Sequence, residues 1–349
     1  MSYGGDNKLN HQLFVIWVTH NCNLRCRYCY EKKSKHKSMD DATANRVIKF
    51  IIEYVIEHAI NVCDIHFHGG EPLLKYDIID KIRKGIMVVD GCKFNFSITT
   101  NATLLTPEIV TELENNFDTI SISIDGRPEI HDCYRKTTDG NGSFYKALSG
   151  VSYFENINKL RIRMTVTKEN ACELYNNIKY LCELGFIWID PGIDLFAEWD
   201  DETTKILEDN LRRVYQFYQD KPYMYRFDII NPVFYNVQGC EGGKKTIQID
   251  YEGALYPCSF VVGDFNMRIG TIWDGIDHSL VDKIHEQNKD LLIQCTGCNM
   301  QTYCVATNCR ILQSHILKNN KVVLPILCRM QNFKYSLWKK HHSLRKDDT

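Results

Sequence analysis

Three cysteines with a short spacing lie near the start of the chain. Cys22, Cys26 and Cys29 form the pattern Cys-x3-Cys-x2-Cys directly after an apolar, strand-like segment. A structural zinc site uses four protein ligands, whereas a [4Fe–4S] cluster held by only three thiolates leaves one iron free to bind a small molecule. The pattern therefore favours an iron–sulfur cluster, and we expect Arg25 and Arg27 to offset the charge of the thiolates. The alternative is a zinc loop completed by His20 or by a distant ligand.

Seven further cysteines lie in the last third of the chain. They are Cys240, Cys258, Cys295, Cys298, Cys304, Cys309 and Cys328. The Cys-x2-Cys spacing within this group suits zinc ribbons as well as iron–sulfur clusters. The remaining five cysteines lie in apolar or helical contexts, and we expect them to be buried free thiols that pack as small hydrophobic side chains. These are Cys63, Cys92, Cys133, Cys172 and Cys182.

Polar motifs follow three further strand-like segments. They are Gly69-Gly70-Glu71-Pro72, Thr99-Thr100-Asn101-Ala102-Thr103-Leu104 and Ser123-Ile124-Asp125-Gly126. Paired glycines let a backbone approach a ligand closely, although each motif alone also suits a simple turn. Since barrel enzymes build their sites at the C-terminal ends of the strands, these motifs and the cysteine loop indicate one shared site.

The elements that would position these motifs alternate between strands and helices. We expect strands at Leu13–Thr19, Asp64–His68, Lys93–Thr99, Thr119–Ile124, Arg161–Val166 and Ile187–Leu195. We expect helices at Ala42–Ile60, from Thr106 onward, and at Ser143–Phe154, Asn170–Leu184 and Asp200–Gln219. Such alternation predicts an α/β fold with a parallel sheet and right-handed crossovers. Six units are too few for a closed eight-fold barrel, so we expect an open, partial (β/α)6 TIM-like barrel over residues 1–225. Helical periodicity ends near Tyr225, and residues 226–349 are expected to form a small Cys-rich domain.

Composition limits the function classes. The chain has 349 residues, of which 44% are hydrophobic and 25% charged, and its formal net charge is −2. This balance is typical of a globular protein, and the charge argues against nucleic-acid binding by bulk electrostatics. There is no apolar run of about 18 residues and no signal-peptide pattern at the N-terminus. We therefore expect a cytoplasmic protein that does not act on a membrane.

The four motifs together resemble those of the radical S-adenosylmethionine (SAM) superfamily. The resemblance implies that Cys22, Cys26 and Cys29 hold a [4Fe–4S] cluster whose open iron binds SAM. Reductive cleavage of SAM would give methionine and a 5′-deoxyadenosyl radical that abstracts hydrogen from a substrate. The resemblance places Tyr28 near the adenine, Glu71 at the SAM ammonium, Ser123 and Arg135 at the SAM carboxylate, and Asp125 on the ribose side. It also includes Gly69, Gly70 and Asn101 in the cofactor site.

The late cysteines resemble the SPASM domain, a Cys-rich extension of peptide-modifying radical SAM enzymes. One departure is that four residues, not three, separate Cys304 from Cys309. The resemblance implies two auxiliary [4Fe–4S] clusters, and so three clusters in the chain. Cys295, Cys298, Cys304 and Cys328 would hold auxiliary cluster II, and Cys240, Cys258 and Cys309 would hold auxiliary cluster I. Because residues 241–257 contain no cysteine, auxiliary cluster I is expected to keep one open iron. Zinc sites remain the alternative.

Three hypotheses for the function follow from the resemblance. The first is an oxidoreductase that matures a ribosomally synthesised peptide (RiPP maturation) by forming a thioether or carbon–carbon cross-link. The second is an anaerobic sulfatase-maturating enzyme that oxidises Ser or Cys to formylglycine. Those relatives usually carry an Asp after the second cysteine of the auxiliary domain, where this chain has Ser259. The third is a non-enzymatic iron–sulfur or zinc protein.

The resemblance also implies conditions and partners. An enzyme of this kind would work anaerobically with an electron donor similar to flavodoxin or ferredoxin, on a peptide or protein substrate. Many peptide maturases carry an N-terminal recognition domain, but only 11 residues precede the first strand region here. A separate leader-recognition protein is therefore a further expected partner. We expect no nucleic acid and no membrane among the partners, and the sequence identifies no general base.

Overall fold

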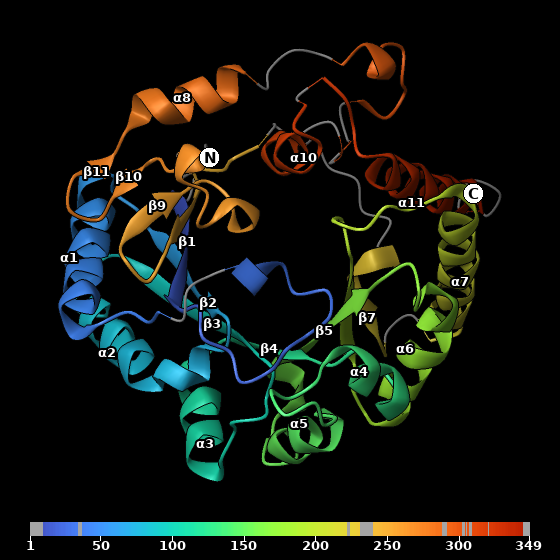
Figure 1. The fold of residues 1–349 in the computed structure, drawn as a ribbon, viewed down its shortest axis with the longest axis horizontal. Coiled ribbons are helices and arrows are strands. Elements are labelled where there is room, and N and C mark those ends of the chain that lie inside the picture. Colours follow the sequence, from blue (N-terminus) through green and yellow to red (C-terminus); the bar gives the residue numbers. More distant parts are fainter. Residues whose placement is uncertain are drawn as a thin grey trace, which may run out of the picture.

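The computed structural model describes residues 10–33, 37–221, 224–230, 240–287, 292–301, 304, 306, 309–319 and 321–344. The described strands form one sheet in the order β11-β10-β9-β8-β1-β2-β3-β4-β5-β6-β7. Strands β8 and β1 to β7 pair in parallel, and β9, β10 and β11 extend the sheet in antiparallel pairs. The sheet curves, and its two end strands do not pair with each other (Figure 1). The α/β partial barrel expected from the sequence is thus confirmed.

The parallel strands agree closely with the expected ones. They are β1 (His11–Thr19), β2 (Val62–Gly69), β3 (Lys93–Thr100), β4 (Thr119–Ser123), β5 (Leu160–Val166), β6 (Trp188–Ile193), β7 (Arg226–Phe227) and β8 (Thr246–Ile249). The antiparallel strands are β9 (Ala254–Tyr256), β10 (Gly270–Thr271) and β11 (Gly275–Ile276). Strands β7 and β8 add parallel pairs at both sides of the six expected strands, which the sequence analysis did not anticipate.

Helices cover the convex face of the sheet (Figure 1). They are α1 (Asp41–Glu57), α2 (Tyr76–Ile86), α3 (Pro107–Asn116), α4 (Pro128–Tyr134), α5 (Phe144–Val151), α6 (Leu174–Glu183) and α7 (Asp201–Asp220). Local chemistry sets where they begin. Asp40 caps α1 by accepting a hydrogen bond from the Thr43 N–H, and Thr106 caps α3 in the same way through Ile109. Side-chain oxygens at this position satisfy N–H groups that have no partner within the helix.

The period of two along the strands separates an apolar face from a polar face. In β2 the buried side chains Cys63, Ile65 and Phe67 alternate with the partly exposed Asp64 and His66. In β5 the buried Leu160, Ile162, Met164 and Val166 alternate with partly exposed residues in the same way. The apolar face packs under the helices, so the concave face of the barrel is lined by polar side chains.

The late part of the chain contains helices that the sequence analysis missed. They are α8 (His278–Glu286), α10 (Arg310–Leu317) and α11 (Pro325–Leu344). The expectation that helical structure ends near Tyr225 is therefore wrong. In Figure 1 these helices run along the open side of the curved sheet, and α11 lies beside α7. The prediction of a domain boundary after residue 225 stays a prediction.

The scattered cysteines are not all buried. Cys63 and Cys182 are buried as expected, whereas Cys133 and Cys172 are exposed and Cys92 is partly exposed. The expectation that all five are buried is wrong, because a position in a helix or strand does not show whether the side chain lies on the buried or the exposed face. In the part of the chain that is described, none of the helices combines the length and the apolar character needed to cross a membrane.

Candidate active site

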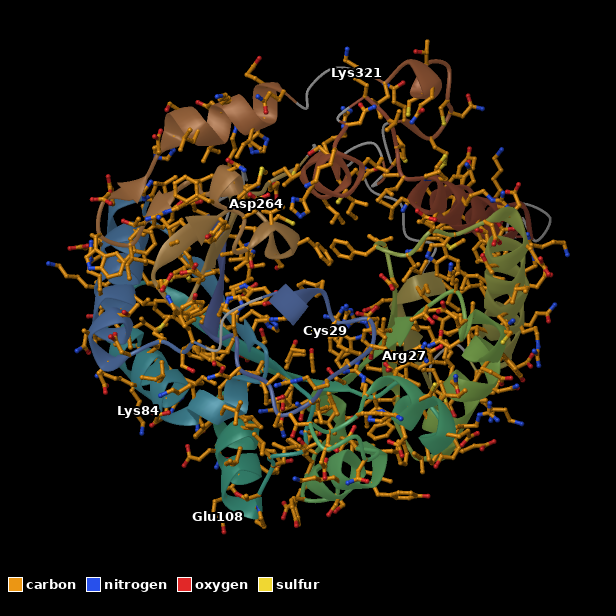
Figure 2. The ribbon with its side chains drawn as sticks, viewed as in Figure 1. Arg27, Cys29, Lys84, Glu108, Asp264 and Lys321 are labelled. Carbon is orange, nitrogen blue, oxygen red and sulfur yellow. The ribbon has the colours of Figure 1, made fainter. Side chains whose placement is uncertain are left out.

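The loop after β1 carries the first three cysteines across the mouth of the barrel, where Figure 2 labels Arg27 and Cys29. Backbone hydrogen bonds tie this loop to the segment after α4. The N–H of Arg25 donates to the Lys136 carbonyl at 2.7 Å, and that of Arg27 donates to the Tyr134 carbonyl at 2.9 Å. The loop is therefore held at two points, against the last residue of α4 and against the segment that follows this helix.

The three thiols of this loop lie within one another's electrostatic influence. Burial, followed by smaller contributions that include Glu71, Cys26 and Cys29, raises the pKa of Cys22 to about 12. Burial also raises the pKa of Cys26, to which the neighbouring Cys29 adds, while Arg135 opposes the rise. Buried thiolates that repel one another are costly unless a cation binds them. The donor set thus fits a positively charged iron–sulfur cluster held by three thiolates.

A cation that was not expected, Arg135, acts on one of these thiols. The Arg25 guanidinium donates to the carbonyls of Cys22 and Leu24, and that of Arg27 donates to the thiol of Cys133 at 3.5 Å. Burial raises the pKa of Cys26, and the positive charge of Arg135 opposes this rise and so favours the thiolate. Charge compensation by Arg25 and Arg27 stays a prediction, and Arg135 is an additional cation that spacing in the sequence did not indicate.

Arg135 belongs to a buried network with Asp125 and Tyr28. Its Nε donates to Asp125 Oδ2 at 2.9 Å and its Nη2 to Asp125 Oδ1 at 3.1 Å, which makes a two-pronged ion pair. The Tyr28 hydroxyl donates to the same carboxylate at 2.5 Å, and the guanidinium lies 5.3 Å from the centre of the Tyr28 ring. Although burial opposes it, Asp125 raises the pKa of Arg135. The network brings three of the expected SAM-binding residues next to the thiol of Cys26.

Glu71 is fully buried and its carboxylate makes three hydrogen bonds within the protein. Oε1 accepts from the Thr100 hydroxyl at 2.7 Å and from the Leu73 N–H at 3.1 Å, and Oε2 accepts from the Asn101 N–H at 2.7 Å. Burial raises the pKa of Glu71 to about 7 despite these bonds. The carboxylate thus joins the ends of β2 and β3. Its contact with the SAM ammonium stays a prediction, and the structure assigns it a positioning role in addition.

The remaining expected cofactor residues surround the cysteine loop. A Cβ added at Gly70 would lie 2.3 Å from the Asn21 carbonyl oxygen, so only glycine permits this close approach of loop and strand end. Gly69 has a φ of 145°, and a Cβ there would lie 2.2 Å from the Thr19 carbonyl oxygen. The Asn101 amide donates to Asn23 at 2.9 Å, within the loop. Ser123 is buried at the end of β4.

The late thiols fall into the two expected sets. Burial, followed by Cys258 and Cys240, raises the pKa of Cys309 to about 12. Burial raises the pKa of Cys328, and smaller contributions come from three further thiols, those of Cys304, Cys295 and Cys298. These four thiols form the second set. The extra residue before Cys309 therefore does not remove that thiol from its set. In the described residues, no three Cys, His, Asp or Glu side chains converge as the ligands of one metal ion would. Iron–sulfur ligation by these residues stays a prediction.

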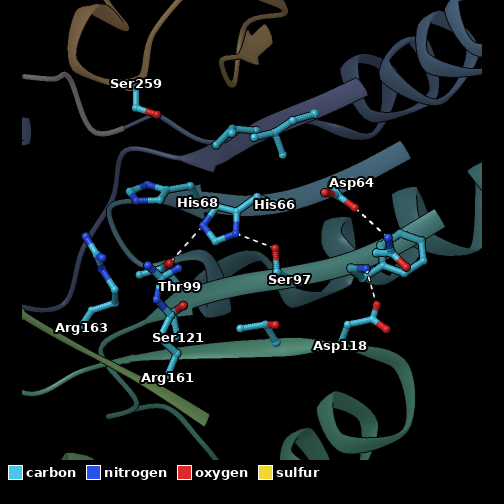
Figure 3. Close-up of a pocket in the computed structure, with 15 residues that line it drawn as sticks. Asp64, His66, His68, Ser97, Thr99, Asp118, Ser121, Arg161, Arg163 and Ser259 are labelled. Carbon is cyan, nitrogen blue, oxygen red and sulfur yellow. Dashed lines mark hydrogen bonds between the residues drawn. The ribbon is translucent and has the colours of Figure 1, made fainter. Parts of the chain in front are cut away.

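A cavity of about 520 Å³ lies inside the barrel, lined by apolar side chains of β1 and mostly polar side chains of β2 to β5 (Figure 3). Both ring nitrogens of His66 hydrogen-bond to hydroxyl groups, at 2.8 Å to Ser97 and 3.0 Å to Thr99. Burial lowers the pKa of His66 to about 3 and that of His68 to about 4, so both rings are neutral at pH 7. Ser259, from the late segment, reaches this cavity and donates to Gln248 at 2.9 Å.

Two arginines of this cavity were not identified from the sequence. Arg161 and Arg163 project from β5 into the cavity, and both donate to Asp190 on β6. The Arg-x-Arg alternation within an otherwise apolar strand was the available signal, because a period of two places both side chains on the same face.

The comparisons with known proteins agree with this geometry. Residues 16–188 match the Radical SAM superfamily. The chain carries a radical SAM domain. It is 35% identical over 179 residues to an uncharacterised protein of Methanocaldococcus jannaschii, a match that covers 49% of this chain and 58% of that protein. It is 25% identical over 335 residues to the cysteine-type anaerobic sulfatase-maturating enzyme of Clostridium novyi, covering 83% of this chain and 85% of the enzyme. Across four of the curated relatives, the chain spans 36% to 58% of their length.

Solved structures share the fold of this chain, including its radical SAM domain. The structure of anSMEcpe with bound AdoMet superposes with a TM-score of 0.79 at 21% identity, covering 96% of this chain and 99% of that one. Streptococcus suis SuiB bound to its precursor peptide SuiA gives a TM-score of 0.67 at 17% identity, covering 92% and 76%. At these identities the likeness is one of fold, and it extends over the late segment as well as the barrel.

Proposed function

We propose that this chain is a radical SAM enzyme of the SPASM type that oxidatively modifies a ribosomally synthesised peptide. The observation that carries the proposal is the loop of three neighbouring thiols, which would repel one another as thiolates, beside the Arg135–Asp125 pair in a chain whose residues 16–188 match the superfamily. In the proposal, residues 1–225 form the radical SAM core and residues 226–349 the auxiliary domain. Three [4Fe–4S] clusters and SAM are the cofactors.

The bound cluster and SAM would supply the carbon-centred radical that abstracts hydrogen. Cys22, Cys26 and Cys29 would hold that cluster, and Asn101 fixes their loop through Asn23. Arg135 carries a permanent positive charge that suits the SAM carboxylate, and Asp125 orients its guanidinium through two hydrogen bonds. The cavity beneath them, with its neutral histidines, would receive the substrate.

The set of three late thiols favours a thioether product. Cys240, Cys258 and Cys309 influence one another's pKa, and no fourth cysteine lies between the first two. A cluster held by three protein thiolates keeps a coordination position for an external ligand. A cysteine of the substrate peptide is the proposed ligand there, since a thiolate is the group that iron–sulfur clusters bind.

A second candidate is the maturation of anaerobic sulfatases. The C. novyi relative carries this activity in its name and aligns with 83% of this chain, and anSMEcpe has also been solved with a bound Kp18Cys peptide. Against this candidate stands Ser259, which occupies the position of the Asp expected in such enzymes. Its hydroxyl donates to the Gln248 amide, so this position offers no carboxylate base.

The electron donor and any leader-recognition protein belong to the proposal as partners. An electron carrier similar to flavodoxin or ferredoxin would reduce the cluster, and anaerobic conditions would protect it. Both partners are inferred from the resemblance of the motifs, and a peptide partner is consistent with the peptide-bound states of the anSMEcpe and SuiB structures.

The test is the reaction of reconstituted enzyme, SAM and dithionite with a panel of Cys-containing peptides. A thioether or carbon–carbon cross-link retains the sulfur and removes a pair of hydrogen atoms, which mass spectrometry detects. Formylglycine made from Cys loses the sulfur and reacts with hydrazines. We expect a cross-link in the wild-type reaction and none after replacement of Cys240, Cys258 and Cys309 by Ala. Aldehyde formation on a sulfatase-motif peptide, with no cross-link on any peptide, would establish the second candidate instead.

A further inference from the structure

The barrel cavity has two chemically different ends. Figure 3 shows the side chains of His68 and Arg163 at one end and those of Asp64 and Asp118 at the other. The two acids are already engaged. Asp64 pairs with His11 at 2.8 Å, and Asp118 accepts from the Phe96 N–H at 2.8 Å. The acidic end is therefore part of the scaffold, and the other end presents cationic and N–H groups.

The cations behind Arg163 outnumber the acids that face them. Asp190 accepts from both Arg161 and Arg163 through the same oxygen, Oδ2. Asp228 lies 3.7 Å from Arg161 and 2.9 Å from Arg226. Lys334 also lies near Asp228 and adds a further cation. Three arginines and a lysine thus share two carboxylates. The cations are Arg161, Arg163, Arg226 and Lys334, and the carboxylates are those of Asp190 and Asp228.

Within this group, Arg163 has hydrogen-bond donors in the cavity that have no acceptor among the described residues. Only its Nη1 has an acceptor among the described residues, so Nε and Nη2 are available. Its side chain is 40% exposed, whereas that of Asp190 is 9% exposed. Burial and then the neighbouring Arg161 lower the pKa of Arg163 to about 10, as expected for a guanidinium whose charge is incompletely compensated.

His68 offers a second donor at the same end. Its Nδ1 accepts a hydrogen bond from the Gly69 N–H at 2.8 Å. Because the ring is neutral at pH 7, the proton must lie on Nε2. Nε2 has no partner among the described residues, so it is an available N–H donor. The N–H donors of Arg163 and His68, together with the incompletely compensated charge of Arg163, suit the two oxygens of a carboxylate.

This donor end lies next to the cofactor-binding residues. Arg163 pairs with Ser123 in the register of β5 against β4, so it is one strand away from an expected SAM contact. Its charge also affects the pKa of Tyr30, which lies beside Cys29 and Cys258. A substrate group bound to Arg163 would therefore lie between the SAM loop and the auxiliary thiols.

We propose that Arg163, assisted by His68, binds a carboxylate of the substrate peptide and so selects peptides with an Asp or Glu next to the modified residue. The inference rests on the proposed function for its substrate, a peptide, and adds the chemistry by which that peptide is chosen. A charge-assisted hydrogen bond of this kind corresponds to a preference of roughly tenfold or more over a neutral amide.

The test compares matched Cys-containing hexapeptides that differ only by Asp or Asn, or by Glu or Gln, at one position. Their dissociation constants are measured by fluorescence anisotropy with reconstituted, SAM-bound enzyme and no reductant. The wild type should bind at least one acidic peptide about tenfold more tightly than its amide partner. Arg163→Gln should lose this preference, and Arg163→Lys should keep part of it because the charge remains. Arg213→Gln is the matched control, since Arg213 stacks on Tyr175 at 4.1 Å on the outer helices and should retain the preference.

Several outcomes would overturn the inference. These are no binding of any hexapeptide, no acidic preference in the wild type, and a preference that survives in Arg163→Gln. A tenfold loss of SAM affinity in Arg163→Gln would assign the guanidinium to the SAM carboxylate instead, while unchanged SAM affinity shows that the variant is folded. Acidic peptides that bind selectively but are never modified under reducing conditions would refute the proposed function and leave the carboxylate site standing.

Discussion

A buried carboxylate, Glu71, ties together the segments that hold the proposed SAM cluster. It accepts hydrogen bonds from residues at the starts of two connecting segments, Leu73 after β2 and Asn101 after β3. Asn101 in turn donates to Asn23 of the cysteine loop. The cost of burying this charge is visible in its pKa, which burial raises to about 7. The Glu71 carboxylate thus holds these segments in place, but burying its charge lowers the stability of the fold.

The raised pKa predicts a pH-dependent stability. The pKa of Glu71 is about 7 in the folded protein and 4.5 in the unfolded chain. Its contribution to the free energy of unfolding is therefore fully present below pH 4.5 and is lost as the pH rises through 7. Between pH 6 and pH 8 the wild type should lose about 1 kcal/mol of unfolding free energy through this group. Glu71→Gln cannot titrate and should lack this component in urea unfolding of the cluster-free protein.

Glu108→Gln is the control, because Glu108 is exposed at the start of α3 and should keep the wild-type difference between the two pH values. An identical pH dependence in Glu71→Gln and in the wild type would show that Glu71 is ionised in both folded and unfolded states, contrary to the burial seen here.

At the scale of elements, separate loops and one helix bring the late cysteines together. Cys328 lies in the first turn of α11, which begins at Pro325. Its thiol is influenced by the three thiols between residues 295 and 304, while Cys309, just before α10, is influenced by the other set. The cysteines of the two sets alternate along the chain. Both sets can therefore form only if α10 and α11 keep their positions relative to the loop before them.

Replacing both Cys304 and Cys328 by Ala leaves auxiliary cluster II only two thiols, one fewer than either of the other clusters has, and should remove it while the other two remain. Three [4Fe–4S] clusters correspond to about 12 iron atoms per chain, so the variant should hold about 8 after anaerobic reconstitution. Iron and acid-labile sulfide analysis provides the measurement. Cys172→Ala is the matched control, because this thiol is exposed and outside both sets. Iron near 12 in the double variant, or about two zinc ions per chain with little iron in the wild type, would contradict the assignment.

The sequence predicted the main strands of the barrel well but not the helices of the late segment. The six main strands and the helix that follows Thr106 were predicted because local periodicity and residues that favour a helix start determine them. Helices α8 and α10 have only 9 and 8 residues, too few for a clear period among the surrounding cysteines and glycines. The pairing of Arg135 with Cys26 could not be predicted either, since it depends on how the segment after β4 meets the first loop.

At the scale of the whole molecule, the late segment extends the barrel sheet on both sides. Strand β8 pairs in parallel with β1, from Leu13 with Thr246 to Ile16 with Ile249. Helix α11 packs on α7, where Arg329 contacts Asp201 at 2.9 Å and Glu208 at 3.2 Å. The main hydrophobic core contains side chains from both parts of the chain, including Ile247, Ile249, Phe333 and Leu337 from the late part.

This continuity predicts that residues 1–225 alone do not form a stable unit. Without β8 the edge of β1 is unpaired, and the apolar core is opened to solvent. The truncated chain should aggregate or unfold without cooperativity when followed by circular dichroism on heating, while the full chain unfolds cooperatively. A cooperative transition of the truncated chain at the temperature of the full chain would show instead that the core is an independent domain.

The central claim is that the first three cysteines hold the cluster at which SAM is cleaved. Its most direct test is the formation of 5′-deoxyadenosine by anaerobically reconstituted enzyme with SAM and dithionite. We expect the wild type to produce it, and the triple variant Cys22→Ala, Cys26→Ala, Cys29→Ala to produce none while retaining about 8 iron atoms in the auxiliary clusters. Undiminished 5′-deoxyadenosine from the triple variant would contradict the account.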